Sequence, residues 1–158
     1  TIDPENKLLV AMPRRRLDWE AMRDSLLAVS GQIDFKMGGP SVDLFAPPYT
    51  PRRSVYGLVD RQNLPSELRT FDFAPPDASA PQRHQTTVPQ QALFLMNGPF
   101  LKQTVKRLAA RPDLVRIDSS NKRIDSVHVL LFGRHARAGE IETALKYLSA
   151  STGQDQAD

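Results

Sequence analysis

Apolar residues recur every three or four positions along several stretches of the chain, the spacing that places side chains on one face of an α-helix. The clearest stripe in the first half consists of Trp19, Met22, Leu26, Val29 and Ile33. It predicts a helix that Asp18 can cap and that Gly31 can end, because glycine readily adopts a positive φ. We therefore expect Trp19 and Leu26 in the core.

A shorter helix is predicted over residues 3–12. Asp3 stands at the N-cap position and Pro4 at the first helical position, and Leu8, Leu9 and Met12 follow at helical spacing. Pro13 would end this helix. The first residues are polar and do not resemble a signal peptide. The chain begins at a predicted helix without an initiating methionine, so we expect it to be a piece of a longer protein.

Helical spacing returns at Val88. A short helix is predicted with a cap at Thr86 or Thr87, and its core stripe consists of Val88, Ala92, Leu93 and Met96. The sequence Asn97-Gly98-Pro99 should break this helix, with Asn97 capping the next one.

Three more helices are predicted after this break. The first contains Leu101, Val105 and Leu108 and ends before Pro112; the second begins at Ser119 or Ser120 and ends at Gly133; the third contains Ile141, Ala144, Leu145 and Leu148. The last two could form an antiparallel hairpin.

Between Pro40 and Pro99 the pattern changes, because ten of the thirteen prolines fall there and leave little room for long helices. Weak alternation over residues 52–59 favours a short strand, and residues 65–68 favour a single helical turn. Aromatic residues are unusual in disordered linkers, so we expect four of them to pin this segment to the helices: Phe45, Tyr49, Phe71 and Phe73.

These patterns predict a mainly α fold, an irregular helical domain with a long proline-rich excursion and at most a short strand or hairpin. Residues 1–150 are expected to form a single helical domain, and residues 151–158 a polar tail. The 40% hydrophobic content of the 158 residues is enough for one core.

Composition excludes several kinds of site. The chain has no cysteine, so it cannot contain a disulfide, a thiolate metal site or a thioether-linked haem. No apolar run approaches the roughly 18 residues that a membrane span needs. The three histidines, His84, His128 and His135, form no close pair with supporting carboxylates, so we expect no metal and no other cofactor in this chain.

The formal charge is +3, but its distribution is uneven, because residues 100–137 contain nine basic and three acidic side chains. A polyanion could bind there if five cations shared one face: Lys102, Lys106, Arg107, Lys122 and Arg123. The run Arg14-Arg15-Arg16 lacks interleaved aromatics and a recognition-helix pattern, which makes nucleic acid an improbable partner. The alternative role of these arginines is to pair with nearby acidic side chains or to bind loop carbonyl oxygens.

Four residues are the candidates for a binding site. His84 lies just before a predicted helix N-terminus, where free N–H groups can receive an anion, although threonine caps would satisfy the same groups. A pocket that joined His84 with Arg52, Arg53 and an acid such as Asp72 would favour an enzyme. Nothing in the sequence indicates a catalytic residue, because no nucleophile turn and no phosphate loop occurs.

Several segments carry a family resemblance: Met37-Gly38-Gly39-Pro40, Arg52-Arg53-Ser54-Val55-Tyr56, the run from Thr86 to Phe100, and Leu131-Phe132-Gly133-Arg134. The chain resembles a planctomycete family of unknown function, the C-terminal module of large exported proteins that often carry a cytochrome c domain. The resemblance implies a periplasmic or cell-envelope location, haem in another domain, and a module that begins upstream of this chain. Residues 135–140 depart from the family pattern, which weakens the cap of the last helix.

The sequence leaves three possible functions open. The first is a non-catalytic structural or interaction module whose partners are the other domains of the same polypeptide. The second is part of an enzyme that acts on carbohydrate, with a cleft completed by upstream domains. The third is polyanion or nucleic-acid binding through the basic residues 100–137.

Overall fold

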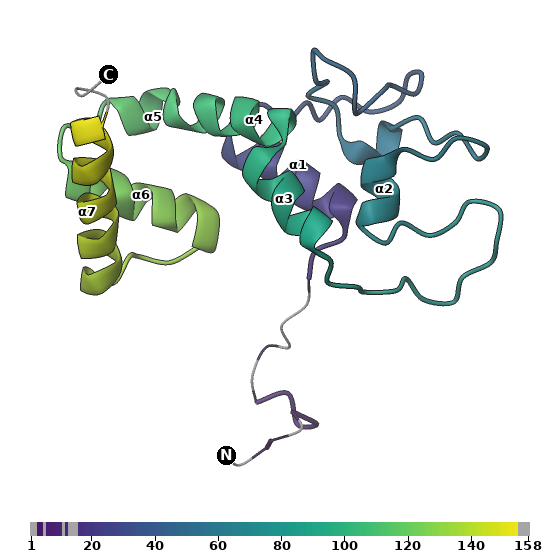
Figure 1. The fold of residues 1–158 in the computed structure, drawn as a ribbon, viewed down its shortest axis with the longest axis horizontal. Helices are drawn as coiled ribbons and strands as arrows, with labels where there is room; N and C mark the ends of the chain where they lie inside the picture. Colours follow the sequence, from purple (N-terminus) through teal and green to yellow (C-terminus); the bar gives the residue numbers. More distant parts are fainter. Residues whose placement is uncertain (1–2, 5, 11, 13–15, 155–158) are drawn as a thin grey trace.

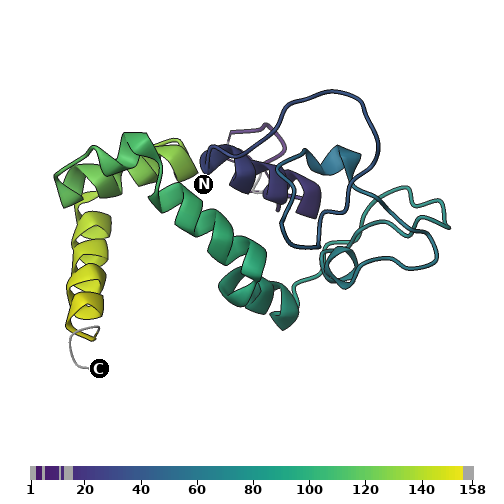
Figure 2. The ribbon, with the colours of Figure 1, turned by 90° about the horizontal axis from the view of Figure 1, so that it is seen from above.

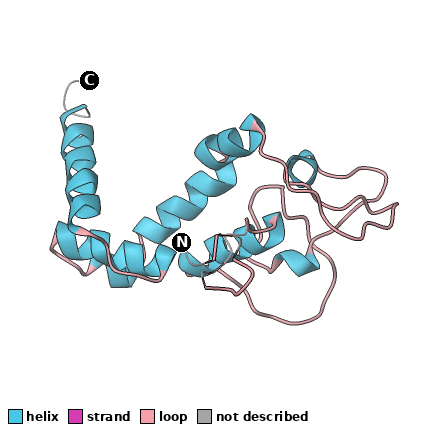
Figure 3. Cartoon of the chain, turned by 90° about the horizontal axis from the view of Figure 1, so that it is seen from below, coloured by secondary structure: helices cyan, strands magenta, loops and turns pink. Residues whose placement is uncertain are grey.

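The structure is a computed structural model that describes residues 3–4, 6–10, 12 and 16–154. Over these residues the chain forms helices and no extended strand (Figures 1 and 3), which confirms the mainly α class. The helical elements in chain order are α1 (Trp19–Val29), η1 (Ser54–Tyr56), α2 (Ser66–Thr70), α3 (Pro89–Asn97), α4 (Pro99–Ala109), α5 (Pro112–Val115), α6 (Ser120–Phe132) and α7 (Ala138–Gln154).

The core lies between α1, α2 and the proline-rich segment. Its buried residues are Trp19, Leu44, Leu68 and Phe71, and the partly buried residues that pack against them include Met22, Phe45, Phe73 and Phe94. Three ring contacts hold the segment to the helices: Trp19 stacks on Phe45, Tyr49 meets Phe100 edge-on, and Phe71 meets Phe94 edge-on. The predicted anchoring by aromatic side chains is therefore confirmed.

The buried face of α1 is rotated from the one that the apolar stripe predicts. Leu27 is 2% exposed and Arg23 only 1%, whereas Leu26 is half-buried. The rotation has a polar cause, because the loop that packs on this face offers carbonyl oxygens that the Arg23 guanidinium binds. Gly31 has φ +73° just after the helix, as predicted, while Asp18 occupies the N-cap position without a side-chain hydrogen bond.

The proline-rich segment is irregular and contains less strand than predicted. Residues 54–56 form the turn η1 where a strand was expected, and the pairing is reduced to two isolated parallel bridges, Asp34 with Arg52 and Val42 with Gly57. The predicted helical turn after Pro65 is confirmed as α2. The loops around 34–42 and 52–58 thus run side by side without forming a sheet.

The predicted helix over residues 3–12 is wrong for the residues that the structure describes there. The Asp3 carboxylate accepts from the backbone N–H groups of Lys7 and Leu8, at 2.9 and 2.7 Å, and closes a turn. Met12 is exposed, so this segment has no core to pack on. A short isolated helix is marginal in water, because its nucleation cost is not offset by packing. Pro13 lies outside the described residues.

The break between α3 and α4 is confirmed, but its caps differ from those predicted. α3 begins after Val88, so neither Thr86 nor Thr87 caps it. Gly98, rather than Asn97, is the N-cap residue of α4. A Cβ at Gly98 would lie 2.6 Å from the carbonyl oxygen of Phe94 in the last turn of α3, so the sharp turn from α3 into α4 requires glycine here.

α3 exposes the apolar side chains that were predicted to be its core stripe. Met96 is 74% exposed, and Ala92 and Leu93 also face solvent, so that prediction is wrong. The buried side chain is Gln91 instead. Its amide nitrogen donates to the Thr70 carbonyl at 2.7 Å, and its amide oxygen accepts from the backbone N–H of Val88 at 3.3 Å.

α5, α6 and α7 extend away from the core at the far end of α4 (Figures 1 and 2). α6 and α7 contact each other but cross steeply, so they do not form the predicted antiparallel hairpin. Neither helix has a buried side chain among those that the structure describes. Gly133 ends α6 with φ +65°, as predicted, and α7 continues to Gln154, into the segment expected to be the tail.

Candidate functional site

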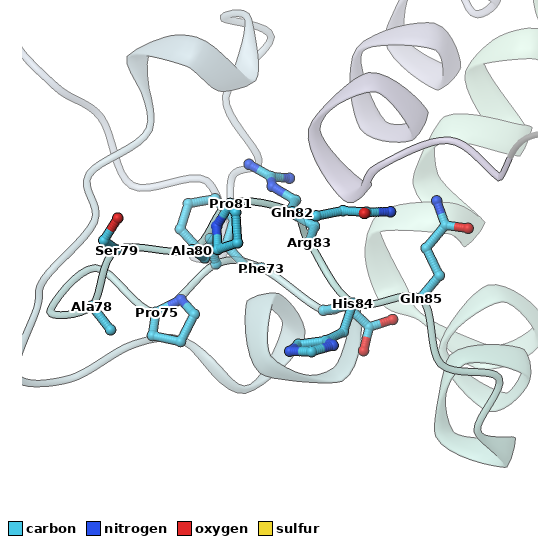
Figure 4. A pocket seen from close by; sticks show the side chains of 12 residues that line it. Phe73, Pro75, Ala78, Ser79, Ala80, Pro81, Gln82, Arg83, His84 and Gln85 are labelled. Atoms are coloured by element: carbon cyan, nitrogen blue, oxygen red, sulfur yellow. The ribbon is translucent and has the colours of Figure 1, made fainter.

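A cavity lies inside the loop between α2 and α3. It has a volume of about 790 Å³ and is lined by Asp72, Phe73, Ala74, Pro75, Ala78, Ser79, Ala80, Pro81, Gln82, Arg83, His84 and Gln85. In the view of Figure 4, His84 and Gln85 lie at the end of the loop opposite Ala78 and Ser79. Half of the lining residues are alanine, proline or serine, and the larger polar side chains belong to Asp72 and to residues 82–85.

Asp72 closes the base of this loop. Its carboxylate accepts from both the backbone N–H and the hydroxyl of Thr86, at 2.9 and 2.7 Å, and its own φ is +58°. Burial raises the pKa of Asp72, but the hydrogen bonds from Thr86 and the nearby charges of Arg16 and His84 outweigh it, so the pKa lies below its ordinary value. Thr86 thus binds Asp72 instead of capping α3.

Arg83 ties the other side of the loop to α1. Its guanidinium donates to both carboxylate oxygens of Glu20, at 2.8 and 2.7 Å, lies 3.7 Å from Asp18 and stacks over the ring of Phe73. Burial raises the pKa of Glu20, but the hydrogen bonds and charge of Arg83 more than compensate, and the pKa is lowered. Arg83 is therefore committed to holding the loop rather than to binding a ligand.

Arg16 adds a third tie at the same place. Its guanidinium donates to the carbonyl oxygen of Thr86 and lies over the Phe71 ring. This is the loop-carbonyl role that the sequence left open for the arginine run. Arg14 and Arg15 lie outside the described residues.

His84 is exposed and lines the cavity beside Asp72. Together with the hydroxyl of Ser79 and the amides of Gln82 and Gln85, it offers hydrogen-bonding groups to a small polar molecule. A metal site is not formed there, because the described residues contain no group of three or more metal-ligating side chains.

Arg52 lies elsewhere and organises the Met37-Gly38-Gly39-Pro40 turn. Its guanidinium donates to the carbonyl oxygen of Gly38 at 2.6 Å and stacks on the Tyr56 ring, with 4.2 Å between the guanidinium carbon and the ring centroid. The Tyr56 hydroxyl in turn accepts from the Gly38 N–H at 3.0 Å. Two of the four segments that carry the family resemblance, residues 37–40 and 52–56, thus form one structural unit.

Arg53 lies half-exposed beside α1, where its Nε is 3.7 Å from the Asp24 carboxylate. Of the four candidates, Asp72 and His84 share the cavity, whereas Arg52 and Arg53 are absent from its lining. The structure therefore places the candidates at two separate locations.

Sequence reasoning missed the most buried charge of the chain, Arg23. Its guanidinium donates to the carbonyl oxygens of Thr50 and Arg52, at 2.6 and 2.9 Å, and to the Ser54 hydroxyl at 3.3 Å. Burial lowers the pKa of Arg23, and the neighbouring charge of Asp24 opposes this shift. An arginine flanked by Trp19 and Leu27 at spacings of four residues was the available signal, since both neighbours are core residues.

A second polar cluster holds the turn between α6 and α7. Glu140 accepts from both terminal nitrogens of Arg134, at 2.9 and 2.7 Å, and from the Arg137 N–H at 2.8 Å, and these bonds lower its pKa to about 2. Asp125 binds the His135 ring and the Ala136 N–H, at 2.9 and 2.8 Å. Glu140 thus supports the start of the last helix, where the departure from the family pattern predicted a weak cap.

Among the described helices, none combines the length and hydrophobicity that crossing a membrane demands. No curated protein and no solved structure matches the chain. A family model does match, over residues 1–148, and its description is "PSD1: Protein of unknown function (DUF1553)". Since the match spans nearly the whole chain, this protein belongs to the PSD1 (DUF1553) family.

Proposed function

We propose that this chain is a non-catalytic interaction module that packs against other domains of the same polypeptide. The observation that carries the proposal is its accessible surface of 12,035 Å². A compact monomer of 17.7 kDa would expose about 7,900 Å². Such an excess is expected of a module whose faces are completed by neighbouring structure.

The nature of the exposed surface supports the same proposal. Large apolar side chains face solvent on the loops and on several helices, among them Phe35, Met37, Val55, Leu93, Met96, Val105 and Phe132. Monomeric soluble proteins rarely leave extensive apolar patches exposed, and those that remain mark interaction sites.

This proposal can be tested by measuring amide hydrogen exchange of these residues in the isolated chain and in the full-length polypeptide. We expect slower exchange in the longer protein for the amides that adjoin these apolar side chains, because docking removes them from water. Equal exchange in the two forms would exclude the proposal.

The loop cavity favours a second candidate, a binding subsite for carbohydrate in a cleft shared with upstream domains. Its support is the cavity of about 790 Å³ that joins His84, Asp72 and the glutamine amides with the ring of Phe73, a combination suited to a polar ligand with an apolar face. His84→Ala should then weaken oligosaccharide binding by the full polypeptide, measured by calorimetry, while Gln62→Ala, outside the cavity, should not. Equal affinities would remove this candidate.

The setting that we propose follows from the family resemblance. It is an exported protein of the periplasm or cell envelope, with any haem bound by another domain. Polyanion binding through residues 100–137 is the remaining candidate, and retention on a heparin column that declines with salt would support it.

A further inference from the structure

The outer face of α3 is an apolar helix surface without a partner among the described residues. Ala92, Leu95 and Met96 follow the spacing of one helix face and all three are exposed. Gln91 and Phe94 make the inward contacts of α3: Gln91 is buried and binds Thr70 and Val88, and the Phe94 ring meets Phe71 edge-on. α3 therefore packs inward through Gln91 and Phe94 and leaves an apolar stripe uncovered, where an ordinary surface helix exposes polar side chains.

The neighbouring helix adds positive charge to this surface. Lys102, Lys106 and Arg107 are exposed on α4, and in the described part of the chain no acidic side chain pairs with any of them. Residues 78–112 contain no aspartate or glutamate at all. The surface of the α3–α4 pair is thus apolar and cationic, with no negative charge of its own sequence to balance it.

The cations lie close enough to the apolar face to act with it. Gly98 to Lys102 is the first turn of α4, and only Asn97 lies between Met96 and Gly98. Chain geometry then limits the distance between the Cα atoms of Met96 and Lys102 to about 14 Å. A lysine side chain spans much of that distance, so one partner element can contact both.

We propose that this α3–α4 surface docks an acidic, amphipathic protein segment from another domain of the same polypeptide. The apolar side of that segment covers Leu95 and Met96, and its carboxylates pair with Lys102 and Lys106. Charge complementarity selects the partner, because burying unpaired lysines against a neutral or basic surface would be costly. The inference rests on the proposed interaction module and identifies one of its docking faces.

The test is zero-length carbodiimide cross-linking of the full polypeptide, followed by peptide mass spectrometry. The reagent joins an amine directly to a carboxylate, so Lys102 and Lys106 should form cross-links to acidic residues outside residues 1–158. High salt should reduce these links, because it screens the pairing. Lys146 and Glu142, which lie 2.8 Å apart in α7, supply an internal positive control in the same digest.

Met96→Glu is the matching variant, because it adds a negative charge to the apolar face at a position that is already exposed. It should abolish the external cross-links and speed hydrogen exchange in α3 of the full polypeptide, while the isolated variant keeps the circular dichroism of the isolated wild type. Gln62→Glu adds the same charge at an exposed position of the loop between η1 and α2, and it is the control that should preserve the cross-links.

Three outcomes would overturn the inference. The first is an absence of external cross-links at Lys102 and Lys106 while the Lys146 link forms; slower exchange elsewhere on the module would then leave the interaction module itself standing. The second is self-association of the isolated chain that Met96→Glu removes, since the occupant would be a second copy. The third is protection of α3 by anionic lipid vesicles but not by the rest of the polypeptide.

Discussion

Arg83 and Glu20 form a paired, two-bond contact across 63 residues of sequence, with nitrogen to oxygen distances of 2.8 and 2.7 Å. Arg83 belongs to the irregular loop and Glu20 to the first turn of α1. Because a guanidinium and a carboxylate match in shape, this geometry fixes the direction of the loop as well as its distance from the helix. This ion pair is therefore the tie that joins the cavity wall to α1, beside the contacts that Asp72 and Arg16 make with Thr86.

The first prediction concerns this pair. Arg83→Lys should speed hydrogen exchange of amides 74–86, because lysine cannot form two parallel bonds with one carboxylate. The global stability should fall by only about 1 kcal/mol, since the pair is partly exposed. Arg61→Lys, at an exposed position, is the control. Unchanged exchange in the loop would show that other contacts hold it.

The second prediction is that Arg23→Met lowers the free energy of unfolding by about 3 kcal/mol, since removal of a buried, hydrogen-bonded cation leaves its acceptors without partners. The acceptors are the carbonyl oxygens of Thr50 and Arg52 and the hydroxyl of Ser54. Urea denaturation measures the change. Arg69→Met, on an exposed position of α2, should leave the midpoint nearly unchanged.

A third prediction separates two adjacent leucines of α1. Leu27→Ala should cost roughly 2 to 5 kcal/mol, as truncation of a fully buried leucine does, because Leu27 is 2% exposed. Leu26→Ala should cost clearly less, although the sequence stripe favoured Leu26 as the core residue. If urea denaturation gave equal losses of unfolding free energy for the two variants, the buried face predicted from the apolar stripe would be the correct one.

A fourth prediction distinguishes the two residues at the α3–α4 break. Gly98→Ala should destabilise by roughly 1 to 3 kcal/mol, because its Cβ would clash with the Phe94 carbonyl oxygen at 2.6 Å. Asn97→Ala should change little, since Gly98 is the N-cap residue of α4. Thermal unfolding of both variants decides between this arrangement and an Asn97 cap.

The fifth prediction concerns acid sensitivity at the turn between α6 and α7. Folding lowers the pKa of Glu140 from 4.5 to about 2. A carboxyl whose pKa is lowered by folding stabilises fully above its unfolded pKa and loses that contribution as the pH falls toward the folded pKa. The contribution of Glu140 should therefore be complete above pH 4.5 and disappear between pH 4.5 and about 2.

Glu140→Gln should remove this pH-dependent contribution to stability, because the glutamine amide does not titrate. Nuclear magnetic resonance signals of α6 and α7, followed from neutral to acidic pH, measure the transition. Glu142→Gln is the control on the same helix and should retain the wild-type pH dependence. A transition that is identical in Glu140→Gln and the wild type would contradict the assignment.

Local signals in the sequence were sufficient for most of the helices, although the short α5 was not predicted. Prolines at Pro89, Pro99 and Pro112 mark the first residues of α3, α4 and α5, and Gly31 and Gly133 follow the ends of α1 and α6. These residues restrict or extend the backbone by their own covalent structure, so their effect does not depend on distant contacts. The mainly α class followed from them and from apolar spacing.

Tertiary structure decided which face of each helix is covered. The same spacing describes a buried face and an exposed one, and Leu27 and Met96 differ only in whether another segment lies over them. The helix predicted over residues 3–12 failed for a related reason, since a short helix needs a surface to pack on.

Tertiary structure also separated the candidate site residues. Asp72 and His84 came together because Asp72 binds Thr86 and closes the loop, whereas Arg52 was drawn to the Gly38 carbonyl and the Tyr56 ring. Such pairings join residues far apart in the chain, and each arginine had several possible acceptors. The residue types were therefore determined by the sequence, but their partners were determined only by the packing that selected one acceptor among many.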